Sequence, residues 1–223
     1  MQRNHSAPGT FGHNLSLRLS VFLLAVFCPL VPQSVLAQKS ISVLAAQAAL
    51  SSVIITTPTS QGMGVVMLDG TTVATCYHVV RENQTVSVDT RMGRTTGTVI
   101  ATDEDHDMAI VRIDKVLTPF LQICESRDIP QYHNSFQASM GERWQEPIIR
   151  LGVVIGAFEG VSPNLILSSI PQGGDSGGPV MDESGYLIGI SKCRATYGAE
   201  NKLGTGVIPA WKFLEFIQRT QRY

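Results

Sequence analysis

The stretch Gly173-Gly174-Asp175-Ser176-Gly177-Gly178-Pro179 sets one serine among glycines, towards the C-terminal end of a 223-residue chain. Glycines let the backbone turn sharply and leave N–H groups uncovered by side chains. A serine hydroxyl becomes a nucleophile only when a base takes its proton, and the oxyanion that then develops needs fixed donors. The stretch therefore has the composition of a nucleophile turn, although a glycine-rich loop that merely contains Ser176 has the same composition.

The positions of the histidines decide between two folds that use such a serine. The stretch matches G-x-S-x-G, the nucleophile turn of α/β-hydrolases, in which the histidine follows the serine along the chain. All the histidines here precede Ser176; they are His5, His13, His78, His106 and His133. The chain also lacks the alternating helices that a parallel sheet requires. The order histidine, aspartate, serine is the chymotrypsin-like one.

His78 is the predicted general base. The stretch Thr75-Cys76-Tyr77-His78-Val79-Val80 places His78 at the end of a β-branched strand, where a rigid element can aim the imidazole ring. His106 lies in an acidic turn and is expected to titrate in water, and His133 lies in an irregular segment. A histidine that merely completes the core is the alternative for an isolated His78, and the serine motif argues against it.

Asp107 is the predicted third member of the site. The base needs a buried carboxylate that holds the ring N–H and stabilises the imidazolium. Asp107 abuts the apolar stretch 108–111, so its side chain starts at the edge of the core. The other candidates are Asp89, Asp103 and Asp105, and the last two are expected to be exposed turn residues.

Short β-branched segments separated by turns predict an all-β fold, a sandwich or paired barrels. In the first half they are 52–57, 64–68, 71–75, 85–88, 96–102 and 108–113, with Asp69-Gly70 as a hairpin turn. A looser segment, 114–133, connects them to 148–155, 165–170, 179–181, 186–191 and 204–208. Only 209–221 has helical spacing, with Pro209 at its first position and Trp211, Leu214 and Ile217 on one face, beside Phe213.

The first 37 residues have the plan of a secretory signal peptide. Arg3 and Arg18 precede the apolar segment 19–31, and Val35-Leu36-Ala37 offers a small-residue cleavage site. An uncleaved membrane anchor is the alternative, but Pro29 and Pro32 interrupt the apolar segment. Cleavage after Ala37 leaves 38–223 as one peptidase-sized domain, exported to the periplasm or secreted, with no stable membrane insertion.

Composition narrows the possible partners. The formal net charge is −1 and charged residues make up 16%, so nucleic acid is not expected. The cysteines after the signal are Cys76, Cys124 and Cys193, and no C-x-x-C pair indicates zinc. We expect no cofactor and no metal, and the sequence leaves open whether two of these cysteines form a disulfide.

Several segments resemble bacterial trypsin-like serine peptidases, in the style of the HtrA-like branch. Residues 75–80 are similar to T-A-x-H-V-V, residues 107–113 to D-x-A-x-L-x-I, and residues 174–179 match G-D-S-G-G-P. Weaker matches are 60–64 to S-x-G-x-G and 206–209 to G-x-A-I-P. The resemblance implies two six-stranded antiparallel β-barrels, about 50–115 and 135–208, a helix at about 209–221, and the triad in the cleft between the barrels. It also implies an acyl-enzyme mechanism with the N–H groups of Gly174 and Ser176 as the oxyanion hole.

The chain departs from that family in places. Val79 stands where pancreatic enzymes have a disulfide cysteine, no PDZ domain fits after residue 206, and Asp175 replaces the usual Asn of the HtrA-like branch. No Ile-Val-Gly-Gly activation sequence occurs, so Asp175 is expected to find a partner other than a new N-terminus.

The substrate pocket is predicted from two positions. Ile170, six residues before Ser176, stands where trypsin-like enzymes carry an aspartate, and Ser191 begins a segment that forms one wall. A small or medium apolar residue before the cut is therefore expected. Lys192 is expected to point to solvent, the alternative being that it attracts an acidic side chain.

The sequence thus predicts a serine endopeptidase acting on proteins or peptides, with Ser176 as nucleophile, His78 as base and Asp107 as its partner. The alternatives are a catalytically impaired binding or chaperone-like module with the same fold, and an acyl hydrolase that acts on esters, which fails on chain order.

Overall fold

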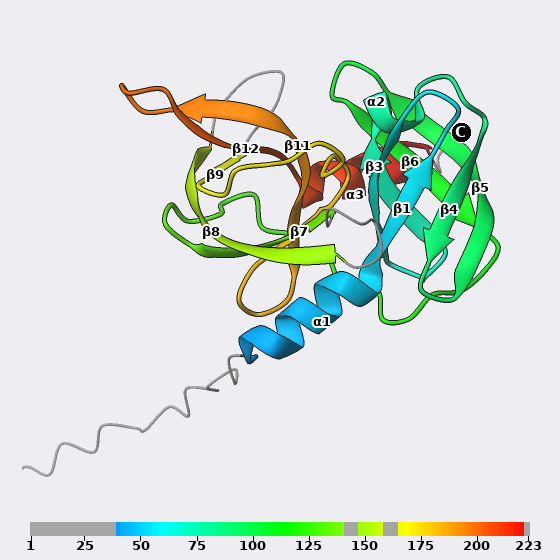
Figure 1. Ribbon diagram of the computed structural model, residues 1–223, viewed down its shortest axis with the longest axis horizontal. Helices are drawn as coiled ribbons and strands as arrows, with labels where there is room; N and C mark the ends of the chain where they lie inside the picture. Colours follow the sequence, from blue (N-terminus) through cyan, green and yellow to red (C-terminus); the bar gives the residue numbers. More distant parts are fainter. Residues whose placement is uncertain (1–38, 141–146, 158–164, 221–223) are drawn as a thin grey trace, which may run out of the picture. The chain divides into compact units, whose positions relative to one another are not determined.

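A computed structural model describes residues 39–140, 147–157 and 165–220 (Figure 1). The chain divides into two units, 1–34 and 35–223, and everything described belongs to the second. The predicted signal peptide, 1–37, lies outside the described residues. Within the described ranges, no helix combines the length and apolar character that crossing a bilayer requires.

Six antiparallel strands close the first barrel in the spatial order β1-β2-β3-β6-β5-β4. They are β1 Ser52–Thr56, β2 Gln61–Met67, β3 Thr72–Cys76, β4 Thr85–Thr90, β5 Gly93–Asp103 and β6 Met108–Ile113. Strands β2, β3 and β6 are buried along almost their whole length. Side chains on one face of these strands fill the interior of the barrel. Neighbouring segments pack near the outer face, α1 (Ile41–Ser51) at β2 and β11 (Leu187–Tyr197) at β3.

Six further antiparallel strands close the second barrel in the order β10-β11-β12-β9-β8-β7. They are β7 Asn134–Met140, β8 Pro147–Ala157, β9 Leu165–Leu167, β10 Pro179–Met181, β11 Leu187–Tyr197 and β12 Lys202–Pro209. The prediction of two six-stranded antiparallel barrels with a C-terminal helix is confirmed. The segment between Ile113 and Asn134 connects the barrels, as expected.

The predicted hairpin turn between β2 and β3 is present and is held by Asp69. Its Oδ1 accepts hydrogen bonds from the N–H groups of Thr71 and Thr72, both at 2.9 Å. Gly70 has a φ of +77°, a left-handed conformation that glycine adopts without a steric penalty. The turn chemistry read from Asp-Gly therefore positions the first barrel's central hairpin.

Strand β7 is not predicted from the sequence, because the segment 134–140 contains no β-branched residue. Ser135, Gln137 and Ser139 are all buried. Gln137 Oε1 accepts hydrogen bonds from Ser169 Oγ at 2.7 Å and Thr205 Oγ1 at 3.2 Å. These bonds satisfy Gln137, whereas Ser135 Oγ has no hydrogen-bond partner among the described residues. The polar positions alternate with buried Phe136, Ala138 and Met140, so both faces of the strand are covered.

Helix α1 precedes the first strand, and the sequence spacing does not predict it. Leu44 and Ala48 are buried against the core, whereas Ile41 and Val43 are exposed. Apolar residues therefore occur on all sides of α1, and no 3.6-residue stripe identifies it. It packs against β7 and β8 of the second barrel and against β2 of the first, so it joins both barrels (Figure 1).

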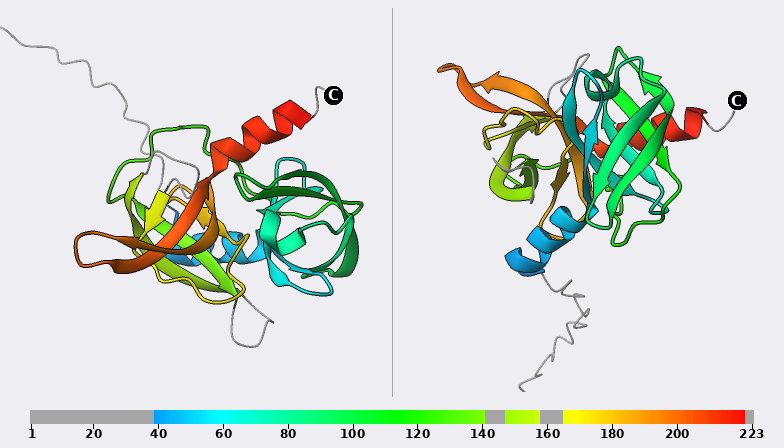
Figure 2. Two further views of the ribbon diagram at one scale, coloured as in Figure 1. Left: turned by 90° about the horizontal axis from the view of Figure 1, so that it is seen from above. Right: turned by 45° about the vertical axis from the view of Figure 1, so that its right-hand side comes forward.

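The C-terminal helix α3 (Ala210–Thr220) is present, but two details of its prediction are wrong. Pro209 is the last residue of β12 rather than the first of the helix. The buried face consists of Ala210, Phe213, Phe216 and Ile217. Trp211 and Leu214 are only half-buried, and the Arg127 guanidinium lies 4.8 Å from the Trp211 ring centre. The helix leaves the second barrel and extends towards the first (Figure 2). Near its end Arg219 pairs with Asp103 of the first barrel at 3.6 Å.

Candidate active site

His78 lies on a single helical turn, α2 (Tyr77–Val80), directly after β3. The expectation that the strand itself ends at His78 is wrong, because β3 ends at Cys76. Val79 and Val80 are buried beneath the turn, and the Tyr77 N–H donates to the Asp107 carbonyl at 3.0 Å. The turn that carries His78 is thereby fixed to the core and to the β5–β6 connection.

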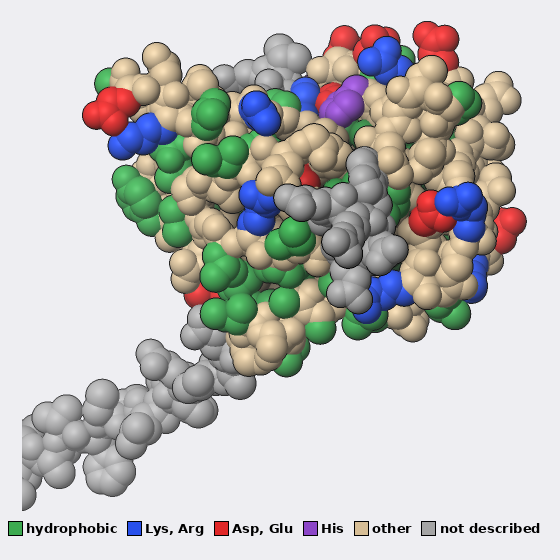
Figure 3. All heavy atoms as spheres, viewed as in Figure 1, with side chains coloured by type: hydrophobic (Ala, Val, Ile, Leu, Met, Phe, Trp, Pro, Cys, Tyr) green, Lys and Arg blue, Asp and Glu red, His purple; other side chains and the backbone are tan. Residues whose placement is uncertain are grey.

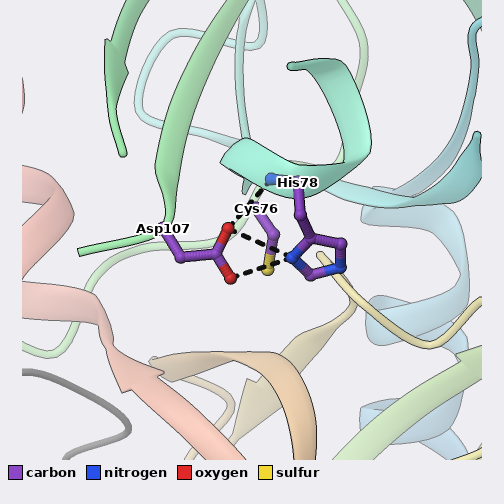
Figure 4. A group of neighbouring side chains, drawn as sticks. All are labelled: Cys76, His78 and Asp107. Carbon is purple, nitrogen blue, oxygen red and sulfur yellow. Dashed lines mark hydrogen bonds and ion pairs between the residues drawn. The ribbon is translucent and has the colours of Figure 1, made fainter. Parts of the chain in front are cut away.

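Asp107 holds the His78 ring through its carboxylate (Figure 4). The distance from His78 Nδ1 is 2.9 Å to Oδ2 and 3.1 Å to Oδ1, and the His78 backbone N–H donates to Oδ1 at 2.9 Å. The Asp107 side chain is 9% exposed. Burial opposes ionisation, but the hydrogen bonds from His78 and the nearby charge of Lys192 outweigh it, so the pKa of Asp107 is lowered. The carboxylate therefore stays ionised beside the ring.

The competing acids and bases have other partners or positions. Asp103 accepts a hydrogen bond from His106 Nδ1 at 2.9 Å, so these two form a separate pair in the same turn. Asp89 pairs with Arg94 at 2.6 Å, and Asp105 is exposed. Asp107 is therefore the acid that meets His78, as the burial argument from the sequence anticipated.

Ser176 is held between the two barrels by its own backbone. Its carbonyl accepts the Met63 N–H of β2 at 2.7 Å, and the following Gly177 N–H donates to the Ser191 carbonyl of β11 at 2.8 Å. Ser176 and His78 line one cleft, together with Lys192 and residues 171–175. The serine is thus brought to the histidine from a segment far along the chain.

The Ser176 hydroxyl rests on a backbone group in this structure. Its Oγ donates to the Lys192 carbonyl at 2.9 Å, and no hydrogen bond joins it to the ring of His78 among the described residues. Catalytic hydrogen bonds are often long or misaligned without substrate. Rotation of the hydroxyl about its Cα–Cβ bond is the motion that redirects it.

Gly177 provides a stability test of this junction. It has a φ of +91°, and a Cβ there would lie 1.8 Å from the Met63 carbonyl oxygen. We expect Gly177→Ala to lower the free energy of unfolding by about 3 kcal/mol, through overpacking and backbone strain. Chemical denaturation measures it, and Gly173→Ala is the matched control because nothing lies within 4 Å of its added Cβ. Equal stability of Gly177→Ala and wild type would contradict the packing described here.

The loop before Ser176 forms a tight turn that suits oxyanion binding. The Asp175 N–H donates to the Gln172 carbonyl at 3.3 Å, and Gly174 has a φ of +92°, as the third residue of a type II turn requires. Within the described chain, the N–H groups of Gly174 and Ser176 donate to no protein acceptor. Both groups are therefore available to an oxygen in the cleft.

Asp175 is hydrogen-bonded to groups other than a new N-terminus, as the lack of an activation sequence predicts. It is 1% exposed. Its carboxylate accepts hydrogen bonds from Ser139 Oγ at 2.9 Å, from the Met140 N–H at 3.0 Å and from the Gln172 N–H at 2.7 Å. Arg150 Nε in turn donates a hydrogen bond to Ser139 Oγ at 2.8 Å. This set of donors holds the loop from inside the second barrel, without a free N-terminus, and nothing local in the sequence indicates it.

The two predicted pocket residues lie in different surroundings. Ser191 is buried, lines the cleft and accepts a hydrogen bond from Gln137 Nε2 at 3.2 Å. Ile170 is 52% exposed and is not among the residues that line the cleft. It adds to the exposed hydrophobic side chains of the second barrel, which also include Ile148 and Leu151. Figure 3 shows hydrophobic side chains on the left of the molecule, the side of the second barrel. The pocket assignment stays a prediction.

Lys192 corrects one expectation outright. It does not simply point to solvent: its side chain is 20% exposed, and its Nζ lies 3.6 Å from Asp107 Oδ2. The sequence places Lys192 on a strand but does not reveal the direction of its side chain.

A sulfur atom completes the surroundings of the histidine. Potential ligand atoms of Cys76, His78 and Asp107 lie within 4.8 Å of one another (Figure 4). Burial raises the pKa of the Cys76 thiol well above its usual value, and the thiol lies 3.3 Å from the Ser191 carbonyl. A protonated thiol and the neighbouring Lys192 ammonium both oppose the binding of a cation to these three residues. Cys76, Cys124 and Cys193 are unpaired in the described structure.

Comparisons with known proteins agree with this geometry. Residues 62–190, more than half of the chain, match the family model described as trypsin-like peptidase domain. Among solved structures, HtrA-type protease AlgW with tripeptide is 22% identical with a TM-score of 0.69, covering 81% of this chain and 63% of its own. The serine endoprotease from Yersinia pestis is 21% identical with a TM-score of 0.68, covering 82% and 67%.

The low sequence identity and partial coverage of these structures restrict what can be inferred from them. At such identities the structural likeness shows the fold alone. This chain spans less than two thirds of the AlgW chain. The search of curated proteins found no match.

Proposed function

Because the chain belongs to the trypsin-like peptidase family, we propose that it is an active serine endopeptidase with Ser176 as nucleophile, His78 as general base and Asp107 as its partner. The observation that carries the proposal is the buried Asp107 carboxylate on Nδ1 of His78, a histidine that lines the same cleft as Ser176. A glycine-rich turn without a catalytic role would not need either neighbour.

The first half of the reaction forms an acyl-enzyme. Asp107 accepts the Nδ1–H of His78, which leaves the other ring nitrogen, pointing away from Asp107 in Figure 4, free to accept a proton. The Ser176 hydroxyl leaves the Lys192 carbonyl, gives its proton to His78 and attacks the peptide carbonyl carbon. The oxyanion accepts hydrogen bonds from the N–H groups of Gly174 and Ser176. His78 then protonates the departing amine, and the peptide C–N bond breaks.

The second half restores the enzyme. His78 takes a proton from water, and the hydroxide attacks the acyl carbonyl carbon. The oxyanion again occupies the site between the Gly174 and Ser176 N–H groups. When the tetrahedral intermediate collapses, His78 returns the proton to Ser176 Oγ and the carboxylic acid product leaves.

An extended peptide is the substrate that suits the cleft. Strand β11 pairs with β10 only as far as Ile190, so residues 192–197 have one edge without a strand partner in the described structure. A peptide added to this edge would gain backbone hydrogen bonds. AlgW, which shares the fold, was solved with a tripeptide. We further propose that the protein acts after export, following removal of residues 1–37.

A second candidate, a catalytically impaired binding module, is favoured by one observation: Ser176 Oγ is bonded to the Lys192 carbonyl and not to His78. Incubation of the purified protein with an unfolded protein substrate separates the two. Mass spectrometry of the products should find new termini inside the substrate, absent with His78→Ala. A wild type that binds the substrate without cutting would favour the module, and hydrolysis of esters alone would contradict the endopeptidase.

A further inference from the structure

Lys192 owes its direction to an irregularity in β11. Ser191 lies opposite Val207, and Cys193 lies opposite Gly206, so Lys192 is an extra residue between two consecutive pairs. Such a β-bulge interrupts the alternation of side chains, and bulges next to active sites often re-aim one. The irregularity accounts for a lysine that turns inward where the sequence suggested solvent.

The re-aimed residue contacts two members of the proposed triad. Its Nζ lies 3.6 Å from Asp107 Oδ2, and its carbonyl accepts the Ser176 hydroxyl at 2.9 Å. Lys192 also lines both of the hollows that His78 lines. Its position is therefore central to the site, although it is neither nucleophile, base nor acid.

Charge balance explains what an ammonium group does there. While His78 is neutral, the Asp107 carboxylate is a nearly buried charge, which needs a counter-ion or strong hydrogen bonds. Among the described residues, Lys192 is the cation paired with it besides the titratable His78. A cation at this place also raises the free energy of a second positive charge on the imidazole.

Other ionisable groups lie near His78 but form no ion pair with the His78–Asp107 pair in the described structure. They are Tyr77 on α2, Arg81 and Glu82 directly after it, Glu104 in the β5–β6 turn, Cys193 and Arg194 on β11, and the buried Cys76. Asp175 turns its carboxylate onto Ser139, Met140 and Gln172. No ion pair joins any of these groups to His78 or Asp107 in the described structure.

We propose that Lys192 is a positioning residue of this active site, whose ammonium group keeps Asp107 ionised and opposes protonation of His78. The base then stays available at lower pH than it would beside Asp107 alone. This inference rests on the proposed function. It differs from the alternative in which Lys192 recognises an acidic side chain of the substrate.

The test is the pH dependence of kcat/KM for wild type, Lys192→Met and Lys192→Arg. Removing the charge should move the acidic limb upward by about half to one pH unit, a roughly three- to tenfold loss of kcat/KM on that limb. Lys192→Arg should restore the wild-type limb. Lys202→Met, which removes a charge from the same β11–β12 hairpin where Lys202 pairs with Glu200, should leave it unmoved.

Two peptides, one neutral and one with glutamates, separate positioning from recognition. The limb should move equally for both if Lys192 acts through the triad. A rise of KM for the acidic peptide alone, with unmoved limbs, would overturn the proposal in favour of substrate recognition. An unmoved limb for both peptides would overturn it outright.

A second measurement does not depend on activity. In the Ser176→Ala background, NMR follows the titration of the His78 ring, assigned by its loss in His78→Asn. Lys192→Met should raise the midpoint of that titration by the same half to one pH unit, and an unchanged midpoint would refute the proposal. If the wild type proves inactive on every substrate, the proposed function fails, and this titration still decides the role of Lys192.

Discussion

Replacing Ser176 by alanine is expected to lower kcat on a protein substrate by on the order of 10⁵- to 10⁶-fold, because the acyl-enzyme cannot form. Among the described residues the hydroxyl makes one hydrogen bond, to the Lys192 carbonyl, and its loss should change the free energy of unfolding by about 1 kcal/mol or less. Activity and stability should therefore separate cleanly. Steady-state kinetics and chemical denaturation of the same preparations measure both.

A matched control is Ser126→Ala, which removes a hydroxyl from the exposed connection between the barrels, where Ser126 Oγ contacts the Asp128 backbone. It should keep wild-type turnover. Residual turnover in Ser176→Ala within tenfold of wild type would mean that another group is the nucleophile.

Asp107→Asn is expected to lower kcat by about 10⁴-fold. The amide that replaces the carboxylate can donate to His78 Nδ1, which would place the ring proton on the nitrogen that must accept one from Ser176. The substitution also removes the partner of the Lys192 ammonium. The matched control is Asp103→Asn, because Asp103 holds His106 with nearly the same contacts outside the cleft. A similar loss in both variants would contradict the assignment of the acid.

Wild type and Asp107→Asn also allow a test of how stability depends on pH. The folded-state pKa of Asp107 is lowered, so its carboxylate stabilises the fold above the pKa of the unfolded chain, and this contribution is lost as pH falls through the folded-state value. Any stability advantage of wild type over Asp107→Asn should therefore shrink in acid. Denaturation at neutral and acidic pH measures it, and an advantage that grows in acid would contradict the lowered pKa.

The elements read from the sequence are those with local signals. β-branched segments, the Asp69-Gly70 turn and the spacing of residues 209–221 each depend on neighbours in the chain, and each is present in the fold. Helix α1 and strand β7 are not predicted from the sequence, for different reasons. In α1 apolar residues face all directions. Strand β7 has no β-branched residue, and its buried Gln137 and Ser139 find partners elsewhere in the second barrel.

The candidate site also has residues that local motifs predict and residues that depend on contacts between distant segments. Ser176, His78 and Asp107 stand in short motifs whose order along the chain excluded the rival hydrolase fold, and the structure brings them to one region. The support of Asp175 and the direction of Lys192 depend on contacts between distant segments, namely β7 with the loop before Ser176 and a bulge in β11 with the β5–β6 turn. No local pattern encodes such contacts. Ile170 was placed by counting residues back from Ser176, and the structure leaves it exposed outside the cleft.

The most direct test of the central assignment is covalent labelling of the nucleophile. The purified protein is treated with a fluorophosphonate under native conditions, digested and analysed by mass spectrometry. One adduct is expected, on the peptide that contains Ser176, and it should disappear after heat denaturation and in Ser176→Ala. A folded wild type that stays unlabelled, or an adduct on a different serine, would contradict the account.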